Sequence, residues 1–273
     1  MKKFKILLIL VLTIIGYVPA QDTLKFNEPY LPSENKVLVF IPHNFAASPD
    51  SVKHSYPLMF LLHGYSGTYT DWSSNTDLQA YSNNYGFIIV CPDGYYNSWY
   101  LDSPILKNSQ YMKFFWKNLA PTLLKTYGKI IKNKEIFITG LSMGGVGAMN
   151  IYISNESFFR SAGSMSGILD IREFPTQWEI SRVLGKYEKK NYSNWNKYSV
   201  IENLNKLKLK NRSLIIDCGT EDFAYNVNVE FIKKAKDLGI NVIFNRRKGS
   251  HNWIFWKEAL VNHLEYFKSL CNN

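Results

Sequence analysis

The sequence has 273 residues, of which 46% are hydrophobic and 20% charged, with 16 glycines and 10 prolines. This is an ordinary globular composition, and it excludes a disordered chain, a collagen and a coiled coil. The formal net charge is +10, but the lysines are scattered in short clusters, which indicates a solvated positive face and no nucleic-acid-binding surface.

The first 20 residues predict an export signal. Three lysines precede an apolar run at residues 6–18, and Val18-Pro19-Ala20 supplies small residues for cleavage. The run is shorter than the about 20 apolar residues that a membrane span needs, so an uncleaved anchor is the less favoured alternative. We expect cleavage after Ala20, a secreted or periplasmic protein without stable membrane insertion, and a single mature domain at residues 21–273. Because the removed segment carries three lysines and no acidic residue, the net charge of the mature chain is +7.

Short β-branched and aromatic runs recur along the mature chain, and most are nearly continuously apolar. Such runs are typical of strands covered on both faces. Residues 23–41, broken by Pro29 and Pro32, contain no helical pattern, so we expect the first strands to form an antiparallel hairpin at one sheet edge. The predicted strands are residues 36–41, 58–62, 87–91, 135–139, 161–165, 214–218 and 241–245.

Longer stretches with helical character lie between these runs, at residues 111–127, 144–154, 224–238 and 253–270. Pro121 must kink or restart the first of these helices. The alternation predicts an α/β fold with a mostly parallel central sheet and a site at the carboxyl ends of the strands. Residues 171–209 break the rhythm, and they form either an inserted cap over the site or a surface excursion without substrate contact.

The segment Gly140-Leu141-Ser142-Met143-Gly144 has the form G-x-S-x-G. It follows a predicted strand and precedes a stretch of small residues, which is the context of a nucleophile elbow. The glycines let strand and helix approach closely around a strained turn. We therefore predict Ser142 to be a catalytic nucleophile; an ordinary strand-to-helix turn is the alternative.

A serine nucleophile needs a base, and the base needs an orienting acid. In α/β-hydrolases the chain order is Ser, then Asp or Glu, then His. His251 alone lies downstream of Ser142 and just beyond a predicted strand, so we predict it to be the base. The other histidines do not meet both conditions, since His43, His54 and His63 precede the serine and His263 falls within the final helix.

The acid has three candidates near the end of the strand at residues 214–218. Asp222 is preferred because it lies deepest in the following loop, with Glu221 as runner-up and Asp217, inside the strand, third. A helix N-cap is the alternative role for Asp222.

The oxyanion hole is expected to use the backbone N–H of Met143, the residue after the nucleophile, and an N–H from an early strand-to-helix loop. His63-Gly64-Tyr65 follows the strand at residues 58–62 and fits that second position. We predict Tyr65 to act through its backbone only. A tight turn without this role is the alternative.

The three cysteines give no sign of a disulfide framework or a zinc site. Cys91 and Cys218 end apolar runs, and Cys271 lies near the C-terminus. We expect free thiols, no metal and no cofactor.

Five motifs, in order, resemble those of the esterase-D-like putative esterases. This α/β-hydrolase group includes tributyrin esterases, feruloyl and acetylxylan esterases of carbohydrate esterase family one, S-formylglutathione hydrolases and mycolyltransferases. The motifs are Leu61-Leu-His-Gly-Tyr-Ser-Gly67, Pro92-Asp-Gly94 with Ser98-Trp-Tyr-Leu-Asp102, Gly140-Leu-Ser-Met-Gly-Gly145, Cys218-Gly-Thr-Glu-Asp222 and Gly249-Ser-His-Asn-Trp253.

The resemblance spans essentially the whole mature chain and implies an α/β-hydrolase fold, with a mostly parallel central sheet and helices on both faces. It implies Ser142, Asp222 and His251 as nucleophile, acid and base, with Tyr65 and Met143 at the oxyanion hole. The glutathione-thioester branch is usually cytosolic and has a serine-glycine-leucine element where this chain has His63-Gly64-Tyr65. Both the export signal and this departure count against that branch.

We therefore expect an exported serine carboxylesterase that acts through an acyl-enzyme on feruloyl or acetyl esters of carbohydrates, or on short-chain esters. Acyl transfer to a sugar alcohol and a non-catalytic carbohydrate-binding protein are the alternatives; the complete triad order speaks against the second.

Aromatic residues near the predicted site loops are candidates for substrate binding. Trp99, Tyr100 and Trp253, with Trp256 nearby, could form a platform for a feruloyl group or a sugar. The alternative for Trp253 and Trp256 is that they pack the last helix against the sheet.

Overall fold

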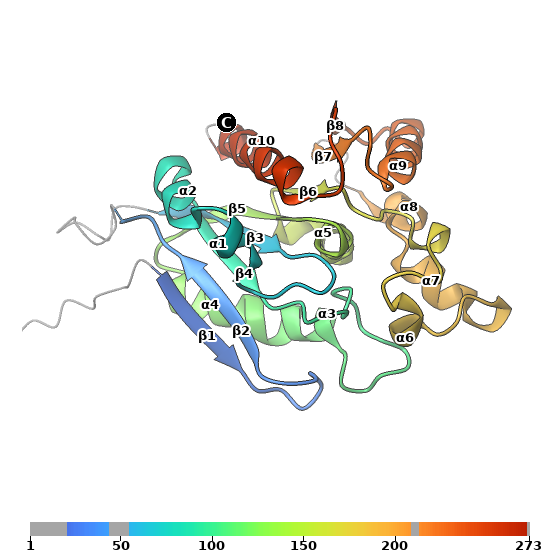
Figure 1. Ribbon diagram of the computed structural model, residues 1–273. Coiled ribbons are helices and arrows are strands. Elements are labelled where there is room, and N and C mark those ends of the chain that lie inside the picture. Colours follow the sequence, from blue (N-terminus) through green and yellow to red (C-terminus); the bar gives the residue numbers. More distant parts are fainter. Residues whose placement is uncertain (1–20, 44–54, 209–212, 272–273) are drawn as a thin grey trace, which may run out of the picture.

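The computed structural model describes residues 21–43, 55–208 and 213–271. The predicted export signal at residues 1–20 and His54 lie outside the described residues. Within the described part, an eight-stranded sheet runs through the centre of the molecule in the order β1-β2-β4-β3-β5-β6-β7-β8 (Figure 1). Its strands are β1 (Gln21–Phe26), β2 (Asn35–Phe40), β3 (Tyr56–Leu62), β4 (Ile88–Pro92), β5 (Ile131–Gly140), β6 (Ser161–Met165), β7 (Leu214–Gly219) and β8 (Val242–Arg247).

The expected edge hairpin is confirmed. β1 pairs antiparallel with β2, and β2 pairs antiparallel with β4, whereas the pairs from β4 across to β8 are parallel. All the predicted strands are present; the last one begins at Val242 and extends to Arg247.

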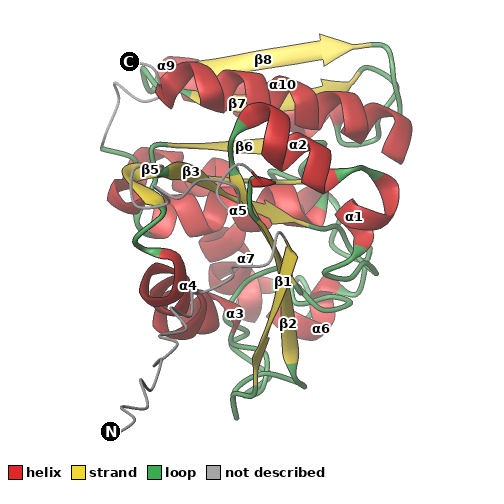
Figure 2. Cartoon of the chain, turned by 90° about the vertical axis from the view of Figure 1, so that its left-hand side faces the viewer, coloured by secondary structure: helices red, strands yellow, loops and turns green. Residues whose placement is uncertain are grey.

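Helices cover both faces of the sheet, as Figures 1 and 2 show. The α-helices are α1 (Asp71–Asn75), α2 (Leu78–Tyr85), α3 (Tyr111–Phe114), α4 (Ala120–Tyr127), α5 (Met143–Ser154), α6 (Ile180–Leu184), α7 (Tyr192–Tyr198), α8 (Val200–Asn203), α9 (Tyr225–Asp237) and α10 (Trp253–Cys271). The helices α1 and α2 were not predicted from the sequence. The predicted interruption at Pro121 takes the form of a π-helical turn, Phe115–Leu119, directly before α4.

Two apolar cores lie on the two faces, because side chains alternate along each strand. In β3, Leu58, Phe60 and Leu62 belong to one core, and Met59 and Leu61 to the other. The first core is closed by α3, α4, α5 and α9, and the second by α1, α2 and α10. The α/β-hydrolase prediction thus holds at the level of layers and strand direction.

The three cysteines are free; Cys91 and Cys218 are buried in β4 and β7, and Cys271 ends α10. Across the described ranges, no helix combines the length and the apolar character required to cross a bilayer.

Candidate active site

Ser142 occupies a sharp turn between β5 and α5. Its backbone has φ 51° and ψ −117°, a region that a residue with a side chain adopts only when the surrounding structure enforces it. Close packing around the turn holds this backbone conformation in place. A Cβ on Gly144, two residues after Ser142, would lie 2.5 Å from the carbonyl oxygens of both Leu62 and His63. Only glycine therefore allows α5 to start this close to the end of β3, and the turn has the geometry of a nucleophile elbow.

His251 joins Ser142 to Asp222. Its Nε2 lies 2.9 Å from Ser142 Oγ, and its Nδ1 lies 3.0 and 2.9 Å from the two carboxylate oxygens of Asp222. The Asp222 side chain is fully buried, whereas the His251 side chain is 17% exposed. A buried carboxylate, an imidazole and a hydroxyl thus form one hydrogen-bonded chain. It runs from Asp222 through His251 to Ser142, at the carboxyl ends of the strands.

The loops after β7 and β8 bring these two groups together. Glu221 N donates to Gly249 O over 3.0 Å, so the loop that carries Asp222 is hydrogen-bonded to the loop that carries His251. Asp222 Oδ1 also accepts a 2.8 Å bond from Ala224 N, which orients the carboxylate locally. The structure places Asp222 against the histidine by these contacts.

The two other acid candidates lie elsewhere. The Glu221 side chain is 53% exposed and pairs with Lys248 at 3.7 Å. Asp217 is fully buried, 3.0 Å from Arg247 and 3.3 Å from His263. Neither contacts His251.

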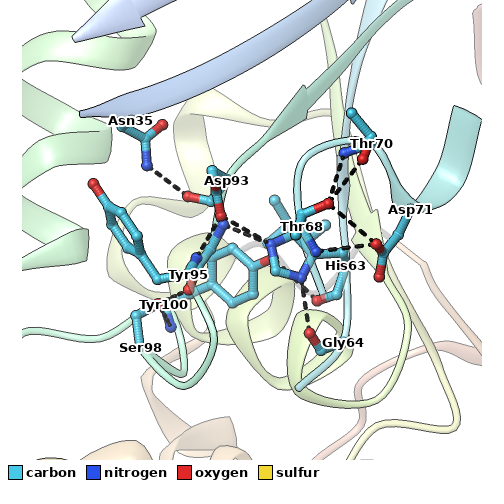
Figure 3. A network of polar contacts seen from close by, with 12 residues as sticks. Asn35, His63, Gly64, Thr68, Thr70, Asp71, Asp93, Tyr95, Ser98 and Tyr100 are labelled. Atoms are coloured by element: carbon cyan, nitrogen blue, oxygen red, sulfur yellow. Dashed lines mark hydrogen bonds and ion pairs between the residues drawn. The ribbon is translucent and has the colours of Figure 1, made fainter. Parts of the chain in front are cut away.

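The loop after β3 is held by the polar network of Figure 3. His63 is buried, and its Nε2 accepts a 2.7 Å bond from Gly94 N. The Tyr100 hydroxyl donates to His63 O over 3.0 Å, and Thr68 N donates to Asp71 Oδ1 over 3.1 Å. These bonds fix both ends of the segment that contains Tyr65.

The backbone N–H groups of Tyr65 and Met143 donate to no acceptor among the described residues, whereas the neighbouring Ser66 N donates to Tyr96 O over 2.8 Å. The side chain of Tyr65 packs edge-on against Tyr96 with ring centroids 4.9 Å apart. A hydrogen bond with Tyr96, followed by partial burial, raises the pKa of Tyr65 to about 12. Its hydroxyl is therefore neutral at physiological pH.

A cavity of about 240 Å³ opens at Ser142 and His251. Three indoles form part of its wall, Asp71 contributes a carboxylate, and the loop after β3 and Leu141 supply the remainder. The lining residues are Gly64, Tyr65, Ser66, Gly67, Asp71, Leu141, Ser142, Trp178, His251, Trp253 and Trp256.

The predicted aromatic platform needs a correction. Trp253 lines the cavity, but Trp99 and Tyr100 do not; they are only 2% and 0% exposed. Both residues brace other parts of the site, since Tyr100 binds His63 O and Trp99 Nε1 donates to Trp178 O over 3.4 Å. Trp256 combines both expected roles, because it lines the cavity and also belongs to the core under α10.

Two aromatic residues of the site, Trp178 and Phe223, were not predicted from the sequence. Trp178 comes from the 171–209 excursion and lines the cavity, so this excursion does reach the site. Phe223 follows Asp222 and lies over His251, with ring centroids 4.2 Å apart. Two features of the sequence could have indicated them. Trp178 is an aromatic residue inside the candidate cap, and Phe223 directly follows the candidate acid Asp222.

Over most of its length, the chain is similar to known esterases. The model of the family described as "Esterase: Putative esterase" matches residues 29–267. The chain is 24% identical to an acetyl esterase of Caldicellulosiruptor saccharolyticus over 263 residues, which cover 90% of this chain and 97% of that protein. It is also 24% identical to a diacylglycerol acyltransferase/mycolyltransferase of Mycobacterium gordonae, over a match that covers 89% of this chain and 82% of that protein. Among solved structures, a ferulic acid esterase superposes with a TM-score of 0.73 at 25% identity, covering 92% of this chain and 97% of that one.

Proposed function

Because the chain belongs to the Putative esterase family, we propose that it is an exported serine carboxylesterase that works through an acyl-enzyme on Ser142. The observation that carries this proposal is the continuous chain Ser142–His251–Asp222, with both links at 2.9 to 3.0 Å. In that chain each group has the partner that its chemical role needs.

The first half of the reaction forms the acyl-enzyme. Neutral His251 accepts the hydroxyl proton of Ser142 through Nε2, while its Nδ1–H donates to Asp222, which stabilises the imidazolium that forms. Ser142 Oγ bonds to the ester carbonyl carbon, and the carbonyl oxygen becomes an oxyanion. The free N–H groups of Met143 and Tyr65 supply donors for this charge.

The tetrahedral intermediate then collapses. The bond from the carbonyl carbon to the alcohol oxygen breaks, and His251 gives its proton to that oxygen. In the second half, water loses a proton to His251 and attacks the acyl carbon; the bond to Ser142 Oγ breaks, and the serine recovers its proton. Each half uses the same 2.9 Å link between His251 and Ser142.

The proposed substrates are acetyl or feruloyl esters of carbohydrates, or short-chain esters. Two relatives support this range by name, an acetyl esterase and a ferulic acid esterase. The indole walls contributed by Trp178, Trp253 and Trp256 suit a planar acyl group or the apolar face of a sugar.

The proposal is tested with the mature chain, from Gln21 onward, and its Ser142→Ala variant. Methyl ferulate, acetylated xylan, and p-nitrophenyl acetate and butyrate serve as substrates. We expect the variant to fold normally and to lose at least about 10⁴-fold in kcat/KM; retained hydrolysis would contradict the role of Ser142. Turnover of ferulate or xylan well above the simple esters identifies carbohydrate ester cleavage, and activity on the simple esters alone indicates a general carboxylesterase.

A second candidate is acyl transfer to an alcohol, which the similarity to a mycolyltransferase favours. It is tested by adding millimolar acceptor sugars to the methyl ferulate reaction and searching by mass spectrometry for acylated sugar. A non-catalytic carbohydrate-binding protein would instead bind glycans saturably without any turnover.

Export and domain organisation are part of the proposal. We place a cleavable signal at residues 1–20, one α/β-hydrolase domain at residues 21–273, and a cap at residues 171–209. The contribution of Trp178 to the cavity supports the cap. Expression of the full chain should yield a secreted or periplasmic protein whose first residue is Gln21, as measured by intact mass.

A further inference from the structure

A column of aromatic rings connects the 171–209 excursion to the candidate base. Trp178 stacks on Phe223 with ring centroids 5.2 Å apart and an interplanar angle of 27°. Phe223 in turn lies 4.2 Å from the His251 ring, although it is 47% exposed. Trp178 is the member of this column that the excursion contributes and that lines the cavity at Ser142.

The backbone holds the Trp178 indole in place at a conformational cost. Trp178 and Glu179 both have positive φ, 48° and 52°, which bulky side chains rarely adopt. Such conformations persist where surrounding contacts enforce them, and they concentrate at functional sites. Here the enforcement comes from Asn97, whose Nδ2 donates to Glu179 Oε2 over 2.7 Å, and from Trp99, whose Nε1 donates to Trp178 O.

Trp178 also differs from the other two indoles of the wall. Trp253 and Trp256 belong to α10, pack edge-on against each other at 5.4 Å and associate with the core beneath that helix. Trp178 is partly buried against the first core, and its ring neighbours include Phe174 at 5.4 Å and Phe223 at 5.2 Å. Its side chain can therefore be truncated without removing a member of the α10 core.

We propose that Trp178 is a specificity-determining residue, whose indole selects planar aromatic acyl groups over flexible aliphatic ones. This inference rests on the esterase function proposed above and names the substrate class of that site. A fixed indole offers a flat face on which a conjugated ring stacks. A flexible chain gains similar contact only after its rotamers are ordered, which reduces the net binding free energy.

The test compares methyl ferulate with methyl butyrate, two esters of the same alcohol, in a pH-stat assay. In Trp178→Ala the ratio of kcat/KM for ferulate to that for butyrate should fall about tenfold, as expected for the loss of one aromatic stacking contact. Trp178→Phe should retain most of the ratio, which separates loss of the ring from disruption of the cap. The matched control is Tyr192→Ala, since Tyr192 is 45% exposed in the same excursion and does not line the cavity; it should leave the ratio unchanged. An unchanged ratio in Trp178→Ala overturns the proposal.

A second measurement needs no turnover. Calorimetric titration of methyl ferulate into Ser142→Ala protein should show binding that weakens about tenfold when Trp178→Ala is added, and that Tyr192→Ala leaves intact. Equal affinities, or no binding to the Ser142→Ala protein, overturn the inference about Trp178. Binding that depends on Trp178 in a wild-type chain without ester hydrolysis would support the inference while the proposed catalytic function fails.

Discussion

Asp217 Oδ1 and Arg247 Nη1 lie 3.0 Å apart, joining the neighbouring strands β7 and β8 just before the loops that carry Asp222 and His251. The guanidinium also donates from Nη2 to Phe255 O over 3.0 Å, which ties both strands to α10. Asp217 is fully buried and the Arg247 side chain 28% exposed. The ion pair therefore fixes the sheet edge from which the loops of Asp222 and His251 project.

Arg247→Met should destabilise the fold, because it removes the guanidinium that pairs with the buried Asp217 carboxylate. The remaining partners of that carboxylate are His263, Asn245 and Asn262. Removing one partner of a buried ion pair costs about 3 kcal/mol of unfolding free energy. Urea unfolding, monitored by tryptophan fluorescence, would resolve a loss of this size. Arg246→Met is the matched control, since Arg246 is exposed on the same strand, and it should change stability by less than about 0.5 kcal/mol. Equal midpoints for the two variants would show that the Asp217–Arg247 pair carries no net stability.

Asp217 should also make stability depend on pH in the acid range. Burial by itself raises the pKa of Asp217, but the His263 imidazole 3.3 Å away and hydrogen bonds from Asn262 and Asn245 outweigh it, and the pKa lies below the ordinary value of 3.8. A group with a lowered folded-state pKa contributes stability that is fully present above its unfolded-state pKa and is lost as the pH falls through the folded-state value.

Asp217→Asn should thus be less stable than wild type at pH 7, and the difference should shrink as the pH falls below 3.8. Urea midpoints measured between pH 7 and pH 2.5 give this comparison. A difference that stays constant across that range would contradict the assigned direction of the pKa shift.

Asp222 and Glu221 should differ sharply as triad acids. Asp222→Asn should lower kcat by about 10⁴-fold, because an amide cannot hold the histidine in the tautomer that accepts the serine proton. Glu221→Gln removes a charge from the adjacent residue, whose side chain is half exposed and does not contact His251, and should change kcat by less than about twofold. Comparable losses in the two variants would move the assignment away from Asp222.

Gly144→Ala should damage the elbow at its base. The added Cβ would lie 2.5 Å from two backbone carbonyl oxygens, those of Leu62 and His63, and backbone at the end of a central strand cannot move aside cheaply. We expect a loss on the order of 3 kcal/mol in unfolding free energy. Lys125→Ala, at an exposed position of α4, serves as the control; a Gly144→Ala protein as stable as this control would show that the contact relaxes.

The local sequence determined the strands, the sharp turn at Ser142 and the chain order of the three proposed catalytic residues. Continuous apolar runs such as residues 58–62 and 87–91 are typical of central strands buried on both faces, and glycines around Ser142 mark a turn that other residues cannot make. These are interactions between near neighbours in the chain, so they are readable without knowing how distant segments meet. The short helices α1 and α2 were not predicted, because segments of 5 and 8 residues show little hydrophobic periodicity.

Only the tertiary structure showed that Trp178 reaches the cavity while Trp99 and Tyr100 do not, and that Asp222, of the three candidate acids, contacts His251. Trp99 lies in a conspicuous motif, yet it is buried and its indole donates to the carbonyl oxygen of Trp178. Trp178 itself comes from a segment without a clear pattern. Asp217 and Asp222 are only five positions apart in the chain, but one faces Arg247 and the other His251. The physical reason is that burial and contact between remote side chains depend on how loops from several strands pack at one sheet edge, and no local pattern records that packing.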